Sequence, residues 1–418
     1  MGEDAETRRG LGSANLIGRD VALKISLSEY RDRQRRLAAA LGAAGLDGAI
    51  VVSRGGATYD RHANVYYLTG HYQHYSYLPD SPGLFSGRAH TIFVITSQGE
   101  NVLCVSVPEY EAAELAADEI HHSARFMDTV VDALQELNLS SGHVGLIGAD
   151  VLPTNQWLAL KEAAPKVQWE NSDELILRLR RIKSTAEREL IRHAASINRR
   201  AVTALLRAIV PGITEAEAIS EAAKIIISEG AGIYYASISS GDKTWQWTSS
   251  PLPGFSTRVL QRGDLLRFDI GIVRHGYLSD FGRAMVVGPA NEEQKRLINT
   301  LHAGLDATIA AVGPGVSVRE VIAAGDNMLT SLGVTSGEPK PGMIVASYPA
   351  HWGHALGLGW ERPWMTADET LTIEPGMYLA IERALTLAGV GTVAAEQNLL
   401  VEEQGTEILT EGPEGRWS

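Results

Sequence analysis

Residues 264 to 288, DLLRFDIGIVRHGYLSDFGRAMVVG, restrict the fold more than any other stretch of the chain. Side chains alternate in character from Leu265 to Ile270, and a second apolar run follows the Arg-His-Gly tripeptide at 274–276. A period of two is typical of β-strands, so the segment predicts a hairpin. If the turn is centred between Arg274 and His275, Asp269 faces Asp280, with Cβ atoms about 4.5–5.5 Å apart.

Two carboxylates placed so closely repel each other. In a partly apolar setting one of them must take up a proton, or a cation must lie between them. A pair of divalent ions about 3.5–4 Å apart is one solution. The alternative is that Asp280 stabilises a loop and Asp269 is exposed, so the choice depends on which other side chains converge on the hairpin.

Composition limits the class of protein. The 418 residues predict two domains, and 44% hydrophobic with 21% charged residues is typical of a globular protein. A net charge of -13 argues against nucleic acid or an anionic membrane as a partner. The single cysteine, Cys104, allows no intramolecular disulfide and favours a cytoplasmic location. Its apolar surroundings predict a buried strand residue.

The chain divides near residue 178. We expect residues 1–24 to form a flexible arm without a signal peptide, and residues 25–177 an α/β domain with strands joined at Gln98–Gly99. Residues 178–418 form the second domain, which opens with two helices. Ser184 with Glu187 and Thr214 with Glu217 predict their capping boxes.

Two glutamates in apolar surroundings extend the set of candidate ligands. Glu374 ends an apolar strand just before Pro-Gly, and Glu396 lies between small residues at the start of another. A glutamate that faces inward from a buried strand is costly unless it is paired or liganded. Glu382, Glu402 and Glu403 are expected to be solvated.

The segment 350–364, AHWGHALGLGWERPW, carries His351 and His354. His-x-x-His occurs by chance in many chains, so the alternative is a glycine-rich turn with half-buried histidines. Gly353 and Gly357 would let the backbone pass close to a site.

With these residues in order, the sequence resembles the pita-bread metallopeptidase family, in its creatinase, prolidase and aminopeptidase P branch. The resemblance runs from about residue 28 to the C-terminus and includes NVYYLTG and RRIKSTAERELIR. It implies five metal ligands, which here are Asp269, Asp280, His354, Glu374 and Glu396.

The resemblance also implies a fold and a chemistry. We expect an α/β N-terminal domain followed by an α+β pita-bread catalytic domain, usually in a homodimer. Two divalent ions (Mn, Co, Fe or Zn) would suit four carboxylates and one imidazole. Glu374 is expected to act as general base and His351 to line the substrate pocket as a second catalytic group.

Three positions depart from the pattern of the branch. Trp360 stands where a histidine is expected before Glu-x-Pro, Trp247 and Thr248 where another is expected, and Ala394 where an arginine is expected two residues before the last glutamate. These changes predict an altered substrate pocket that includes Trp247, Trp360, Arg362 and His351. The alternative for the tryptophans is core packing.

The sequence thus predicts a dinuclear metal-dependent hydrolase that cleaves an amide or other C–N bond in a small molecule or unusual dipeptide. A lyase, a creatinase-like amidinohydrolase and a non-catalytic binding protein on the same scaffold remain as alternatives.

Overall fold

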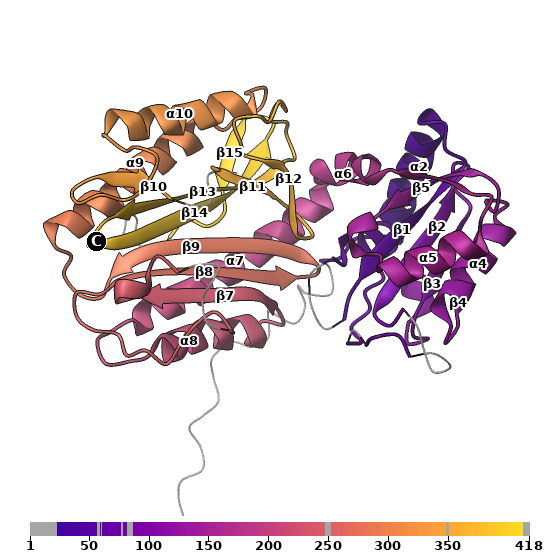
Figure 1. Cartoon of the computed structure of the whole chain (residues 1–418), viewed down its shortest axis with the longest axis horizontal. Helices are drawn as coiled ribbons and strands as arrows, with labels where there is room; N and C mark the ends of the chain where they lie inside the picture. The colour runs from indigo at the N-terminus through magenta and orange to yellow at the C-terminus, as the bar shows by residue number, and fades with distance from the viewer. Residues whose placement is uncertain are drawn as a thin grey trace, which may run out of the picture.

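The computed structural model describes residues 23–56, 59, 61–76, 78–81, 87–246, 252–347 and 351–412. It contains two domains joined by helix α6 (Asp173–Arg181), as Figure 1 shows. The predicted boundary at residue 178 falls within this helix. Most of the expected N-terminal arm lies outside the described residues. Within them, no helix is both long and apolar enough to cross a bilayer.

The N-terminal domain is a six-stranded mixed sheet with the strand order β4-β3-β2-β1-β5-β6. The predicted pair of strands around Gln98–Gly99 is confirmed as β2 and β3, and Cys104 is fully buried in β3. The elements are α2 (Leu27–Ala43), β1 (Gly48–Arg54), α3 (Ala63–Thr69), β2 (His90–Thr96), β3 (Asn101–Val105), β4 (Glu119–His122), α4 (Phe126–Glu136), β5 (His143–Ile147), α5 (Thr154–Ala163) and β6 (Gln168–Asn171).

Strand alternation divides the apolar residues of this sheet between two faces. Ala49 and Val51 of β1 pack in the cluster that contains residues of α2 and α3. Ile50 and Val52 pack in the cluster that contains residues of α4 and α5. The first cluster continues through Tyr277 into the second domain, so the two domains share part of one core.

Two helices, α7 (Thr185–Ala208) and α8 (Glu215–Ser228), open the second domain. Both predicted capping boxes are confirmed, because the Ser184 and Thr214 side chains each accept from the N–H group of the glutamate three residues later. The apolar faces of both helices pack on a three-stranded sheet, β7-β8-β9. Its strands are β7 (Gly232–Ser240), β8 (Leu265–Arg274) and β9 (Tyr277–Val286).

A second sheet, with the order β12-β11-β13-β14-β15, lies against the first. Helices α9 and α10 pack on its outer face, so the domain is layered with helices outside and two sheets inside (Figure 1). The remaining elements are α9 (Glu292–Ala311), α10 (Val318–Ser331), β10 (Ile344–Ala346), β11 (Gly353–Leu356), β12 (Trp360–Trp364), β13 (Tyr378–Leu387), β14 (Gly391–Glu402) and β15 (Gly405–Ile408).

The hairpin β8–β9 forms as predicted, but its register differs. Asp269 pairs with Gly282, and Asp280 pairs with Gly271. The turn is centred between His275 and Gly276, which both have positive φ angles (51° and 84°). Two-residue hairpins favour such a turn because its twist matches that of the strands. The two aspartates are therefore diagonal neighbours on one face instead of direct partners.

Candidate active site

Four buried carboxylates meet between the two sheets. Asp269 comes from β8, Asp280 from β9, Glu382 from β13 and Glu396 from β14. Their exposed fractions are 8%, 1%, 9% and 3%. Carboxylate oxygens of Asp269, Asp280 and Glu396 all lie within 4.8 Å of one another. Glu382 joins them because it stands directly opposite Glu396 in the β13–β14 ladder.

Gly282 allows the two sheets to approach at this point. It pairs with Asp269 across the hairpin. A Cβ atom added at Gly282 would lie 3.4 Å from the Cγ atoms of both Asp269 and Glu396. A larger side chain would therefore push the two carboxylates apart.

Two aromatic donors hold the aspartates. The Tyr235 hydroxyl lies 2.8 Å from Asp269 Oδ1 and also contacts Asp280 Oδ1, while Trp360 Nε1 donates to Asp280 Oδ2 at 3.0 Å. Sequence reasoning missed Tyr235 because a register shift between Ile233 and Tyr235 aims its side chain. β-Bulges re-aim side chains in this way without a strong signal in the sequence.

His354 lies beside the cluster with one ring nitrogen directed at it. Its Nδ1 is 3.1 Å from the Ala355 carbonyl, and its Nε2 is 3.6 Å from Glu382 Oε1. If Nδ1 carries the proton, Nε2 keeps its lone pair for a metal ion. Burial lowers the pKa of His354, which favours the neutral form that a metal ligand requires.

His351 lies on the other side of the same glutamate. Its Nδ1 accepts from the Gly353 N–H group at 3.0 Å and is 3.6 Å from Glu382 Oε1. Burial, together with His354 and Arg383, lowers the pKa of His351 to about 4. Gly353 is required here, because it has a φ of 114° and an added Cβ would lie 1.9 Å from the Ala380 carbonyl oxygen.

The structure does not place Glu374 in the group of Asp269, Asp280 and Glu396, so its role as a ligand stays a prediction. Glu374 is exposed in the segment before β13, where its N–H group contacts Met377 Sδ at 3.5 Å. Glu382 was expected to be solvated and is buried instead. Glu374 was expected to end an apolar strand just before Pro375–Gly376. In the structure, Pro375 and Gly376 form a turn that leads into β13. Glu402 is half-buried and paired with Arg188 and Arg192, and Glu403 is exposed as expected.

A signal for Glu382 was present in the sequence. The β13–β14 hairpin turns at Gly389, and Glu382 and Glu396 stand at equal distances on either side of that residue. Glu382 and Glu396 thus show the same pattern as Asp269 and Asp280, which is two acidic residues on opposite strands of one apolar hairpin.

Burial and mutual repulsion raise the pKa values of three of the four carboxyl groups. Burial, then the Asp280 charge, raises the pKa of Glu382 to about 8. Burial, then neighbouring carboxylates, raises the pKa of Asp269 and of Glu396 well above the usual range. Such shifts mark carboxylates that lack a compensating cation.

The residues fit a metal centre. Among the described residues, Glu396 Oε1 is buried and has no hydrogen-bond partner. A buried carboxylate oxygen in this condition is costly unless a cation binds it. Four carboxylates and one imidazole suit Mn, Fe, Co or Zn. Asp269, Asp280, His354, Glu382 and Glu396 can hold such ions.

We expect the metal-free protein to lose thermal stability as the pH rises from about 4.5 to 8. A carboxyl group with a raised folded pKa stabilises the fold below its unfolded pKa, 4.5 for Glu382, and loses that effect as the pH passes the folded value of about 8. Melting temperatures of chelator-treated protein across this range test the expectation. Saturating Mn²⁺ should remove the decline, and a flat profile without metal would contradict it.

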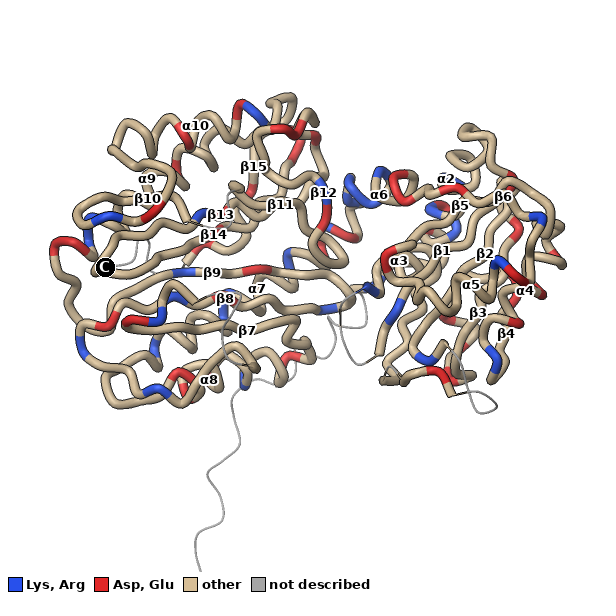
Figure 2. Tube along the Cα trace, viewed as in Figure 1, with Lys and Arg blue, Asp and Glu red and all other residues tan. Residues whose placement is uncertain are grey.

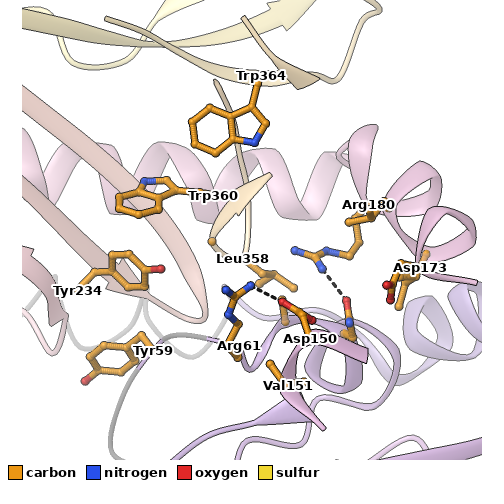
Figure 3. A pocket seen from close by; sticks show the side chains of 15 residues that line it. Tyr59, Arg61, Asp150, Val151, Asp173, Arg180, Tyr234, Leu358, Trp360 and Trp364 are labelled. Carbon is orange, nitrogen blue, oxygen red and sulfur yellow. Dashed lines mark hydrogen bonds and ion pairs between the residues drawn. The ribbon is translucent and has the colours of Figure 1, made fainter. Parts of the chain in front are cut away.

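A cleft of about 520 Å³ lies between the two domains, and Trp360, which contacts Asp280, is part of its lining. Figure 3 shows Tyr59, Tyr234, Trp360 and Trp364 on its wall, with charged side chains of the N-terminal domain and α6 opposite. The Trp360 and Trp364 rings lie 5.8 and 5.0 Å from the His354 ring, which connects the cleft to the carboxylates.

The other predicted pocket residues have different places. Trp247 lies outside the described residues. Arg362 is exposed on β12 between the two tryptophans. Trp352 is buried and donates to Asp326 at 2.8 Å, so core packing is its role. His351 contacts the Trp364 ring at 5.1 Å, at the junction of the cleft and the cluster.

Comparisons with known proteins agree with this geometry. Residues 189–403 match metallopeptidase family M24, and residues 33–182 match the creatinase/prolidase N-terminal domain. The putative dipeptidase YkvY of Bacillus subtilis is 26% identical over 360 residues, covering 84% of this chain and 92% of that protein. An Xaa-Pro dipeptidase of Pyrococcus horikoshii is 25% identical over 357 residues, covering 84% and 91%.

Solved structures show the same fold. Dipeptidase PepE from Mycobacterium ulcerans has a TM-score of 0.75 at 24% identity, covering 94% of this chain and 99% of that one. Prolidase from Pyrococcus horikoshii has a TM-score of 0.74 at 24% identity, covering 91% and 98%. The chain therefore belongs to metallopeptidase family M24, with a creatinase-type N-terminal domain and a pita-bread catalytic domain, and is a metal-dependent hydrolase of C–N bonds.

Proposed function

We propose that the protein is a dinuclear metallohydrolase that cleaves the amide, or a related C–N bond, of a dipeptide or another small molecule. One observation carries the proposal: Asp269, Asp280 and Glu396 have carboxylate oxygens within 4.8 Å of one another, Glu382 stands opposite Glu396, and Glu396 Oε1 has no hydrogen-bond partner among the described residues. If all four are ionised, two divalent ions balance their formal charge. Several relatives are named dipeptidases, which supports a dipeptide-sized substrate.

Divalent ions bound here would supply Lewis acidity and a water molecule of lowered pKa. The chain's own groups do the rest. Asp269, Asp280, His354 and Glu396 would hold the ions, and Tyr235 and Trp360 orient the two aspartates. Glu382 replaces Glu374 in the proposed role of proton acceptor, because its Oε1 lies between His351 Nδ1 and His354 Nε2 at 3.6 Å from each.

The cleft favours a small substrate with an apolar or aromatic group. Trp360 and Trp364 are 48% and 38% exposed, so their rings are available for contact. Binding pockets are commonly lined by such aromatic surfaces with a few polar groups that fix orientation. The Trp360 indole N–H group already contacts Asp280 and cannot accept a proton, unlike the histidine that the resemblance places there.

The function is tested by purifying the protein without chelator and measuring its metal content. The chelator-treated protein is then supplied with Mn, Co, Fe or Zn and assayed on dipeptides, N-acyl amino acids and cyclic ureides. We expect about two ions per chain, activity that depends on them, and one atom of solvent ¹⁸O in the product. Activity without ¹⁸O incorporation would indicate a lyase, and the absence of both metal and activity would favour a binding protein.

A further inference from the structure

The cleft between the domains has a charged wall that faces its aromatic wall. Among the described residues that line the cleft, two are cationic, Arg61 of the N-terminal domain and Arg180 of α6. The Arg180 side chain is 8% exposed and donates to Asn64 Oδ1 at 2.7 Å and to Glu361 Oε1 at 2.5 Å. Its charge is balanced by a buried partner, and breaking such a contact is costly.

Arg61 has a partner that is more easily replaced. Its Nη1 donates to Asp150 Oδ2 at 2.6 Å, and the two side chains are 52% and 56% exposed. An exposed ion pair contributes little to stability, so a competing anion can displace Asp150 at small cost. In the view of Figure 3, the Arg61 side chain lies between Asp150 and Tyr234, which line the same cleft. The guanidinium is therefore placed to pass from Asp150 to a carboxylate that enters the cleft.

The backbone of Arg61 is held in an uncommon conformation. Its φ is 64°, in the left-handed region that a residue with a Cβ atom adopts at an energetic cost. The Arg61 carbonyl accepts from the Arg54 N–H group at 3.0 Å, which ties the residue to the end of β1. Strained residues of this kind are concentrated at ligand sites. The conformation thus supports a binding role for the side chain, in addition to its ion pair.

The opposite wall connects the cleft to the carboxylate cluster. Trp360 Nε1 donates to Asp280 at 3.0 Å, and the Trp360 ring contacts the Tyr234 ring edge-on at 5.7 Å. The Trp364 ring lies 5.0 Å from the His354 ring. Both tryptophan rings are partly exposed. A ligand whose reacting bond lies at the cluster would place an apolar group against these rings and extend its far end towards the N-terminal domain.

We propose that Arg61 is a specificity-determining residue that binds the carboxylate of the substrate in exchange for Asp150, while Trp360 and Trp364 contact an apolar or aromatic side chain. The inference rests on the proposed function and narrows its substrate to a dipeptide or N-acyl amino acid with a free carboxylate. A guanidinium can bind both oxygens of a carboxylate through parallel hydrogen bonds. A cyclic ureide or a peptide ester offers no such group and should bind more weakly.

The test compares two ligands that the enzyme cannot hydrolyse at the peptide position. Both are phenylalanyl-leucine with CH₂–NH in place of the peptide bond, and they end in a free carboxylate or in its methyl ester. Calorimetry on Mn²⁺-supplied protein then gives dissociation constants that do not depend on turnover. The full-length variants are Arg61→Gln, Arg61→Lys and Asp150→Asn.

Arg125→Gln is the matched control. Arg125 pairs with Asp128 at 2.5 Å in the same domain, and its side chain is 80% exposed. It is not among the described residues that line the cleft. Arg125→Gln should therefore bind both ligands as the wild type does.

We expect Arg61→Gln to weaken binding of the acid roughly 10–100-fold and binding of the ester by less than about threefold. Lysine keeps the charge but not the paired donors, so Arg61→Lys should retain part of the affinity. Asp150→Asn should tighten binding of the acid about two- to fivefold, because the guanidinium no longer has to exchange partners.

The opposite signs expected for Arg61→Gln and Asp150→Asn distinguish recognition from a structural role. Loss of a structural ion pair would change the binding of acid and ester alike, in the same direction in both variants, and that result would overturn the proposal. Equal affinity of the wild type for acid and ester would also overturn it. A wild type that holds no metal and turns over no substrate would overturn the proposed function, whereas calorimetry would still measure whether Arg61 selects the acid.

Discussion

Glu382→Gln is expected to lower kcat/KM by about 1,000-fold or more and to release at least one divalent ion. General acid–base groups contribute roughly 10²–10⁴-fold to rate, and this residue is also a proposed ligand. Glutamine keeps the size of the side chain, so the fold should persist. The relief of repulsion within the acidic cluster should leave the metal-free protein at least as stable as the wild type.

Glu374→Gln is the matched control. Glu374 precedes Pro-Gly and fits the ligand pattern in the sequence, but it is exposed in the structure. Its replacement should leave metal content and kcat/KM within about twofold of the wild type, because surface substitutions have small effects. If Glu374→Gln lost metal and Glu382→Gln did not, the ligand would be Glu374 and not Glu382 of β13.

Glu361→Gln is expected to destabilise the protein by roughly 3–5 kcal/mol, because it leaves two buried cations without their shared partner. Glu361 of β12 accepts from Arg180 at 2.5 Å and from Lys183 at 2.9 Å, and all three side chains are at most 8% exposed. Figure 2 shows the basic helix α6 beside β12, where the domains meet. Chemical denaturation of the wild type and of Glu361→Gln measures the difference in the free energy of unfolding.

Asp150→Asn provides the control for that prediction. It breaks the ion pair with Arg61 in the same cleft, but these side chains are 56% and 52% exposed. Exposed pairs contribute about 0–1 kcal/mol, so the free energy of unfolding should change little. If Asp150→Asn and Glu361→Gln lowered the free energy of unfolding equally, the ion pairs of Glu361 with Arg180 and Lys183 would have no special role in joining the domains.

The Glu361 network also predicts a pH dependence. Burial raises the pKa of Glu361, but Arg180 and Lys183 outweigh burial and hold it at about 2, below the value of 4.5 for an unperturbed glutamate. The stabilisation is therefore complete above about pH 4.5 and is lost as the pH falls towards 2. Unfolding curves of the wild type should decline through this range, and those of Glu361→Gln should decline less.

The position of Glu361 next to Trp360 on β12 explains why its ion pairs with Arg180 and Lys183 matter for the cleft. Glu361 faces the domain junction, and the alternation of β12 turns Trp360 and Trp364 towards the cleft. The anchoring of one residue thus fixes the face of the strand that carries the aromatic wall. Sequence reasoning identified Trp360 as a departure from the family pattern, but the buried partners of Glu361 come from segments about 180 residues away.

Local chemistry was sufficient to predict much of the architecture. The capping boxes at Ser184 and Thr214, the strands on either side of Gln98–Gly99 and the β8–β9 hairpin depend on interactions within a few residues. These features follow from periodicity, turn residues and caps, which the chain carries in its own order. The resemblance to the pita-bread family, and not local chemistry, implied Asp269, Asp280, His354 and Glu396 as members of the proposed metal site.

Only the tertiary structure shows which glutamate lies opposite Glu396 and which residues let the two sheets approach. Glu374 matches a local motif, yet strand pairing places Glu382 opposite Glu396. The stacking of two sheets brings Gly282 close to Glu396, more than a hundred residues later in the chain. Strand register and sheet packing are set by the sum of many distant contacts, and no short stretch of sequence contains that sum.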